Sequence, residues 1–90
     1  MNQYQAHSML VTGGAGFIGS NFIRHVLANE PNIKIINLDK LTYAGSMDNL
    51  KKLPNADRHH FIQGDITDAK FIRHLMMHHH IDTIVHFAAE

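Results

Sequence analysis

The chain has 90 residues and a mass of 10.2 kDa, the size of one small domain and too small for two. Its 8 Lys and Arg residues balance 8 Asp and Glu residues, which argues against a nucleic-acid or membrane-surface binder because such proteins normally carry a basic excess. The absence of cysteine excludes disulfides, and no apolar run approaches the roughly 18 residues of a membrane span. The first residues lack a secretory-signal pattern, so we expect a soluble, cytoplasmic protein.

The first half of the chain alternates between strand and helix patterns. Met9–Thr12 is a short apolar run that predicts a buried strand. Apolar residues at helical spacing predict a helix that begins at Phe17 and ends within Asn29-Glu30-Pro31, where proline cannot continue the pattern. The β-branched segment Ile33–Leu38 predicts a second strand. Asp39–Ser46 is expected to be a loop, and Met47–Leu53 is expected to form two helical turns.

The second half repeats the alternation. His60–Gln63 predicts a third strand. Thr67 or Asp68 can cap a helix that runs to about His78, with its apolar residues on one stripe. Ile81–Phe87 predicts a fourth strand.

The order β-α-β-β-α-β predicts an α/β fold: a Rossmann-like, doubly wound parallel sheet of about four strands in the order 3-2-1-4. Residues 1–8 are expected to be a polar tail, and residues 9–90 the first part of a dinucleotide-binding domain. In this strand order the fourth strand has an unpaired apolar edge.

The strongest functional signal is the segment TGGAGFIG, which directly follows the first strand and opens the first helix. Gly13 would allow a tight turn, Gly16 would let the backbone approach a diphosphate, and Gly19 would let the helix pack closely on the strand. The N–H groups near Phe17 and Ile18 would then face the diphosphate, whose charge the helix dipole favours. The alternative is a glycine turn that binds nothing.

A second signal agrees with the first. Asp39 follows the second strand, 20 residues after Gly19. A carboxylate at this point can accept hydrogen bonds from both adenosine ribose hydroxyls and would repel a 2′-phosphate, so NAD is predicted over NADP. The neighbouring Lys40 could weaken that preference. The alternative is that Asp39 only caps a turn.

Two further positions lie where a dinucleotide would extend. Asp65 could accept a hydrogen bond from the adenine amino group while Ile66 packs on the ring; alternatively, Asp65 begins the cap of the next helix. Phe87, Ala88 and Ala89 close the fourth strand, and the small residues leave room for the cofactor's ribose and nicotinamide.

These residues resemble a known family. The glycine segment, together with His86–Glu90, is similar to extended short-chain dehydrogenase/reductases that act on nucleotide sugars. The segment NLDKLTYAG at Asn37–Gly45 narrows the resemblance to the dTDP-glucose 4,6-dehydratases. The resemblance covers Met9–Glu90, nearly the whole chain.

The resemblance implies an NAD-dependent hydro-lyase that converts dTDP-glucose to its 4-keto-6-deoxy product. Bound NAD takes a hydride from C4 of the sugar, water leaves across C5–C6, and the hydride returns to C6. The full-length enzyme would be a homodimer. Matched residue by residue, the cofactor contacts would be Phe17 and Ile18 at the diphosphate, Asp39, Lys40, Leu41 and Thr42 at the adenosine ribose, Asp65 and Ile66 at the adenine, and Phe87, Ala88 and Ala89 near the nicotinamide.

The catalytic residues of the family are missing from these 90 residues. The superfamily uses a Tyr-x-x-x-Lys pair, but Tyr4 is followed four positions later by Ser8, and Tyr43 by Met47. We therefore expect an N-terminal fragment that is inactive on its own. The open alternatives are another nucleotide-sugar epimerase or dehydratase, a non-catalytic dinucleotide sensor, and a related fold that holds FAD or S-adenosylmethionine.

Nine histidines, three of them consecutive at His78–His80, raise the question of a metal site. His74 and His78 have i, i+4 spacing, but no carboxylate at helical spacing completes a set of three ligands. No metal site is therefore expected. His86 is interpreted as a packed residue near the cofactor edge, or as one that supports the direct cofactor contacts, rather than as a catalytic base.

Overall fold

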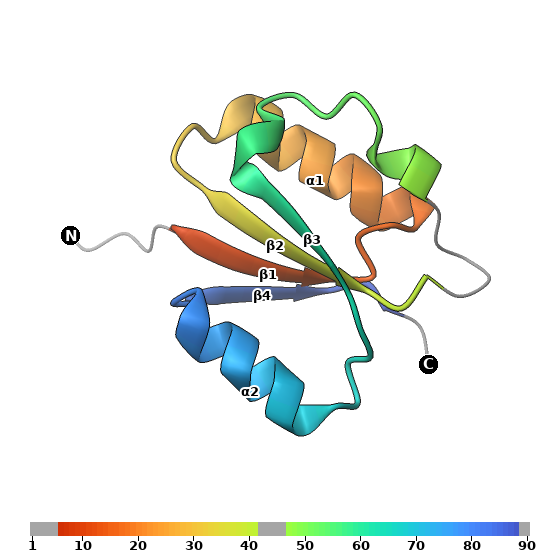
Figure 1. The fold of residues 1–90 in the computed structure, drawn as a ribbon. Coiled ribbons are helices and arrows are strands. Elements are labelled where there is room, and N and C mark those ends of the chain that lie inside the picture. The colour runs from red at the N-terminus through yellow and green to blue at the C-terminus, as the bar shows by residue number, and fades with distance from the viewer. Residues whose placement is uncertain (1–5, 42–46, 89–90) are drawn as a thin grey trace.

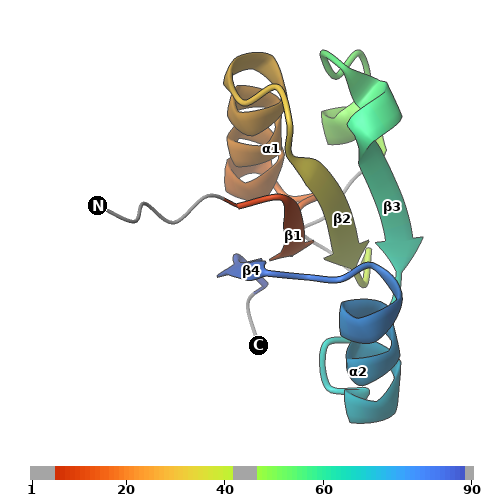
Figure 2. The ribbon, with the colours of Figure 1, turned by 90° about the vertical axis from the view of Figure 1, so that its left-hand side faces the viewer.

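A computed structural model of the chain describes residues 6–41 and 47–88. Four parallel strands form one sheet in the order β3-β2-β1-β4. Figures 1 and 2 show α1 on one face of this sheet and α2 on the other. The predicted architecture and strand order are thereby confirmed. The elements are β1 (Ser8–Thr12), α1 (Phe17–Asn29), β2 (Lys34–Asp39), the 3-10 helices η1 (Met47–Leu50) and η2 (Ala56–Arg58), β3 (His59–Gln63), α2 (Ala69–His78) and β4 (Thr83–His86).

The core has two layers because β1 and β2 are covered on both faces. Successive side chains of a strand point to opposite faces. Val11 therefore packs under α1, against Ile23 and Leu27, whereas its neighbour Leu10 packs toward Leu75 of α2. Double coverage explains why successive residues of β1 and β2 are buried, instead of every second residue.

The two helices begin in different ways. Gly16 is the N-cap of α1, and no side chain caps this end of the helix. At α2, the Asp68 carboxylate accepts a hydrogen bond from Phe71 N at 3.2 Å. Of the two predicted caps, Asp68 is therefore the one used. The amino terminus of α1 differs because its first N–H groups have no side-chain acceptor.

The connection from β2 to β3 differs from the expectation of two helical turns. Within Met47–Leu53, where the helical turns were expected, only the 3-10 turn η1 forms, and Lys52 has a positive φ of 56°. The guanidinium of Arg24, on α1, donates hydrogen bonds to the backbone carbonyls of Asn49, Lys51 and Lys52 at 3.0–3.4 Å. Arg24, rather than further helical turns, therefore satisfies these carbonyls. In addition, the residue before a proline, here the one preceding Pro54, disfavours the helical conformation.

A second arginine ties the same connection to α1. The Arg58 guanidinium donates to the carbonyl oxygens of Leu27, Glu30 and Ile33, each at 2.7 Å. Two of these carbonyls lie at or beyond the carboxyl end of α1, where an α-helix leaves acceptors unpaired. Arg58 therefore closes the end of α1 and anchors the start of β3.

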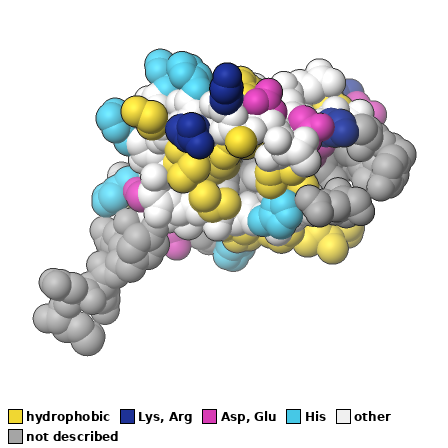
Figure 3. Space-filling view, turned by 90° about the horizontal axis from the view of Figure 1, so that it is seen from below, with side chains coloured by type: hydrophobic (Ala, Val, Ile, Leu, Met, Phe, Trp, Pro, Cys, Tyr) yellow, Lys and Arg dark blue, Asp and Glu magenta, His cyan; other side chains and the backbone are white. Residues whose placement is uncertain are grey.

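The outer edge of β4 pairs with no other strand among residues 6–41 and 47–88. Ile84 of β4 is 53% exposed. Figure 3, which views the molecule from the α2 side, shows hydrophobic side chains open at this surface. The expected apolar edge is thus present. Within the described ranges, no helix has the length and apolar character needed to cross a membrane.

Candidate nucleotide-binding site

The turn between β1 and α1 is built on Gly13, as the sequence predicts. Gly13 has a φ of +75°, a conformation that residues with a Cβ rarely adopt. Its N–H donates to the carbonyl of Leu38 at 2.9 Å. A Cβ here would lie 2.5 Å from the backbone nitrogen of Ala88. The turn is therefore pressed between the carboxyl ends of β2 and β4, with no space for a side chain.

Two more glycines are required by close packing. A Cβ on Gly19 would collide with the carbonyl oxygen of Gly13 and lie 2.9 Å from the Cα of Gly14. Gly19 thus lets α1 approach the turn itself rather than the strand before it. A Cβ on Gly14 would collide with Oδ1 of Asn37, a fully buried β2 side chain. The sequence did not indicate the role of Gly14, because it depends on a contact with a distant strand.

The first turn of α1 is open to solvent at this edge. Phe17 and Ile18 are 75% and 70% exposed. The first N–H groups of an α-helix have no partner within the helix, and the positive end of the helix dipole lies there. An exposed, uncapped helix start next to a glycine turn has the donors and the field that bind a phosphate group.

Asp39 ends β2 beside this turn and is only 9% exposed. Its Oδ2 accepts from Ala15 N at 2.8 Å, and its Oδ1 accepts from Leu41 N at 2.8 Å. The carboxylate therefore joins the glycine turn to the loop after β2. A carboxylate offers about four acceptor positions, so two remain for other donors. The structure shows more than a local turn cap, because Ala15 lies 24 positions away in sequence.

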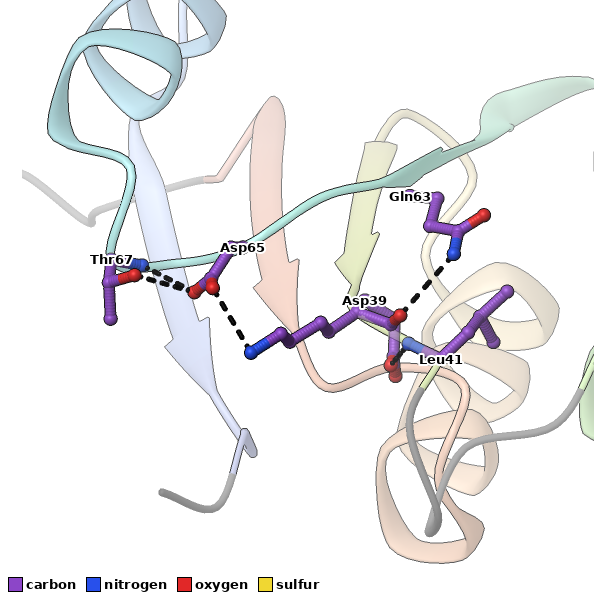
Figure 4. A network of polar contacts seen from close by, with 6 residues as sticks. Asp39, Leu41, Gln63, Asp65 and Thr67 are labelled. Carbon is purple, nitrogen blue, oxygen red and sulfur yellow. Dashed lines mark hydrogen bonds and ion pairs between the residues drawn. The ribbon is translucent and has the colours of Figure 1, made fainter.

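Asp65 lies after β3 and is held by its own turn. Its Oδ1 accepts from the backbone N and the hydroxyl of Thr67, at 2.9 and 2.8 Å, and its Oδ2 pairs with Lys40 Nζ at 3.1 Å (Figure 4). The Thr67 hydrogen bonds, with a smaller contribution from Lys40, lower the pKa of Asp65 to about 2. The side chain of Asp65 is therefore ionised at neutral pH. The cap of α2 is Asp68, so the alternative cap role for Asp65 is not the one observed.

The remaining predicted residues line the same edge where the structure describes them. Ile66 and Leu41 are half-buried. Phe87 is half-buried and its ring contacts the ring of Phe22 at a centroid distance of 5.3 Å, and Ala88 faces Gly13. Gly16 sits at the helix start. The predicted contacts at Thr42 and Ala89 lie outside the described residues.

The histidines lie mostly elsewhere. Figure 3 shows several of them at one end of the molecule, and the ring pairs His74–His78, His78–His79 and His60–His79 have centroid distances of 5.7, 4.8 and 6.4 Å. Burial, then nearby Lys34 and histidines, lowers the pKa of His79. Within the described ranges, no group of three His, Asp or Glu side chains is arranged to hold a metal ion.

His86 lies at the end of β4, near the predicted cofactor edge. It is exposed rather than packed, and its Nδ1 is 2.6 Å from the Thr12 hydroxyl. The packed alternative is therefore wrong, because β4 is an edge strand and its alternate side chains point to solvent. The supporting role behind the cofactor contacts stays a prediction.

A parallel sheet of order 3-2-1-4, a glycine turn that opens α1 and an acidic residue at the end of β2 define the first part of a Rossmann-type dinucleotide-binding fold. Over residues 10–90 the chain matches the family described as GDP-mannose 4,6 dehydratase. The chain therefore belongs to this family.

Individual proteins that the chain resembles are also nucleotide-sugar dehydratases. The chain is 48% identical over 85 residues to dTDP-D-glucose 4,6-dehydratase of Homo sapiens, covering 94% of the chain and 24% of that protein. The structure of dTDP-glucose 4,6-dehydratase from Bacillus anthracis in complex with NAD matches with a TM-score of 0.89 and 42% identity, over 94% of this chain and 27% of that one. The Streptomyces venezuelae enzyme with NAD and TYD bound matches with a TM-score of 0.83 and 47% identity, over 92% and 26%. The chain thus spans about a quarter of the length of these relatives.

Proposed function

We propose that this chain is the NAD-binding portion of a nucleotide-sugar dehydratase. One observation carries the proposal: a glycine turn too crowded for any side chain opens an uncapped helix directly beside the buried carboxylate of Asp39. The turn provides space and N–H donors for a diphosphate, and the carboxylate provides acceptors for a ribose. NAD contains both a diphosphate and an adenosine ribose, and the two groups are directly linked.

The residues fit the cofactor in their chemistry. Backbone N–H groups of Phe17 and Ile18, at the open helix start, would donate to the diphosphate. Asp39 has acceptor positions left for ribose hydroxyls after its bonds to Ala15 N and Leu41 N. The further contacts that we propose are Gly13, Gly16 and Gly19 at the turn, Lys40, Leu41 and Thr42 at the adenosine ribose, Asp65 and Ile66 at the adenine, and Phe87, Ala88 and Ala89 near the nicotinamide.

We infer the activity of the whole protein from its relatives. A dehydratase named for dTDP-glucose is 48% identical over nearly the whole chain, so dTDP-glucose is the proposed substrate. When bound, NAD supplies a hydride acceptor that returns the hydride within one turnover. Residues 9–90 are proposed as part of the dinucleotide-binding domain. The expected tail 1–8 is too long by its last residue, because Ser8 is the buried first residue of β1. A homodimer in the cytoplasm is proposed on the family resemblance.

Calorimetric titration of the chain with NAD tests the proposal. Wild-type chain is expected to bind NAD more tightly than NADP, FAD or S-adenosylmethionine. Gly19→Ala is expected to abolish binding, because the new Cβ meets backbone atoms that cannot move aside. Gly64→Ala is the matched control: the atoms nearest its Cβ belong to the side chains of Phe71 and Leu38, at 2.9 and 3.0 Å, rather than to the backbone, so NAD binding should persist. Tighter binding of NADP, or unchanged binding by Gly19→Ala, would overturn the proposal.

A further inference from the structure

We propose that Asp65 is a specificity-determining residue that helps to exclude 2′-phosphorylated cofactors by keeping the Lys40 ammonium engaged. The inference rests on the proposed NAD site and deepens it. It gives Asp65 a role in cofactor choice in addition to the predicted contact with adenine. Three groups of observations support it: how Asp65 is held, where Lys40 points, and which charges remain beside the ribose position.

Asp65 is positioned before any ligand arrives. One carboxylate oxygen, Oδ1, is taken by both the backbone N–H and the hydroxyl of Thr67. The backbone carbonyl of Asp65 also accepts from Asp68 N at 3.0 Å, which closes the turn into α2. These contacts leave Oδ2 directed to Lys40 (Figure 4). Because the pKa of Asp65 is lowered to about 2, its carboxylate is ionised throughout the physiological pH range.

Lys40 is correspondingly directed toward β3. Its carbonyl accepts from Gln63 Nε2 at 3.4 Å, and the preceding carbonyl, of Asp39, accepts from Gly64 N at 3.1 Å. The backbone at the end of β2 is thus held against the end of β3. From this backbone the ammonium reaches Asp65, although Lys40 directly follows Asp39 in the chain.

The charges at this edge follow from that geometry. Asp39 uses its two oxygens on backbone N–H groups, which carry no net charge, so its negative charge is not neutralised by an ion pair with Lys40. A 2′-phosphate placed beside Asp39 would meet a carboxylate, while the nearest ammonium in sequence is held by Asp65. Releasing that ammonium would give the phosphate a cation partner. Asp65 thereby adds to the discrimination that Asp39 begins.

The test measures the ratio of NADP to NAD affinity, because a lost adenine contact affects both cofactors equally and cancels in the ratio. Asp65→Asn is expected to raise this ratio about fivefold, a magnitude typical of one exposed charge interaction. Adding Lys40→Met to Asp65→Asn should remove the gain. Asp57→Asn, an exposed carboxylate on η2, is the control for a change of net charge and should leave the ratio unchanged.

A second arm does not depend on the folding of Asp65→Asn. In the wild-type background, Lys40→Met should leave the NADP-to-NAD ratio unchanged, because the ammonium is already engaged. A several-fold fall in the ratio for Lys40→Met alone, or no rise for a folded Asp65→Asn, would overturn the role of Asp65. If the wild-type chain binds no NAD at all, the proposed function itself fails and this inference fails with it.

Discussion

The buried carboxylate of Asp39 is predicted to hold the nucleotide site together even without a ligand. In Asp39→Asn, the side chain keeps one oxygen, so it can accept from Ala15 N or from Leu41 N but not from both. Ala15 is fully buried. Hydrogen bonds to charged groups contribute about 1.5–3 kcal/mol, and a buried N–H without a partner costs about 1–3 kcal/mol. We therefore expect the free energy of unfolding to fall by about 2 kcal/mol.

For a domain of this size, each kcal/mol shifts Tm by about 4–8 °C, so Tm should fall by about 10 °C. Thermal and urea unfolding followed by circular dichroism measure this change. Asp57→Asn, an exposed carboxylate on η2, is the control and should change Tm little. If Asp39→Asn unfolds at the wild-type temperature, the carboxylate does not hold the glycine turn, and the account of a preformed site is refuted.

Four further outcomes are expected. Arg58→Ala should lower the free energy of unfolding by about 1–3 kcal/mol in urea titrations, because the carbonyls of Glu30 and Ile33 lose the Arg58 donor and Leu27 keeps only that of Asn55; wild-type stability would contradict this. Burial lowers the pKa of both His59 and His79, so the unfolded chain binds more protons, and the urea midpoint should be lower at about pH 5.5 than at about pH 7.5; the reverse order would refute the assignment. Ile84→Lys should reduce concentration-dependent self-association in sedimentation experiments, since it places a charge on the open strand edge; equal association would show that the edge is not involved. Mass spectrometry should detect no loss of water from dTDP-glucose incubated with NAD and the 90-residue chain, and turnover would show that the Tyr-x-x-x-Lys pair is dispensable.

The sequence predicted those parts of the molecule that depend on local pattern. Apolar periodicity placed the start of α1 at Phe17 and its end within Asn29-Glu30-Pro31, where α1 does end, and alternation of strands and helices predicted the order of the sheet. Gly13 was identifiable because its position after a strand implies a turn with positive φ, which the structure shows. Asp39 was identifiable from its place at the end of the next strand.

What the sequence missed depends on contacts between distant residues. The bonds of Arg24 and Arg58 to carbonyls 25–31 positions away leave no local signal. Those of Arg24 hold the segment in which helical turns were expected. The sequence also did not show that the Lys40 ammonium points to Asp65, because this contact depends on the pairing of β2 with β3. Gly14 is required because the side chains of Asn37 on β2 and Ile23 on α1 lie against it.

Amide NMR spectra of the labelled chain, recorded with and without saturating NAD, test directly whether NAD binds along the carboxyl edge of this sheet. We expect the amide chemical shifts that change on adding NAD to be concentrated at Gly13–Gly19, Asp39–Leu41, Asp65–Ile66 and Phe87–Ala88. Amides of His60 and His79, whose rings belong to the histidine cluster away from this edge, should stay unchanged. An unchanged spectrum, or shifts centred on the histidine cluster, would contradict the proposed site.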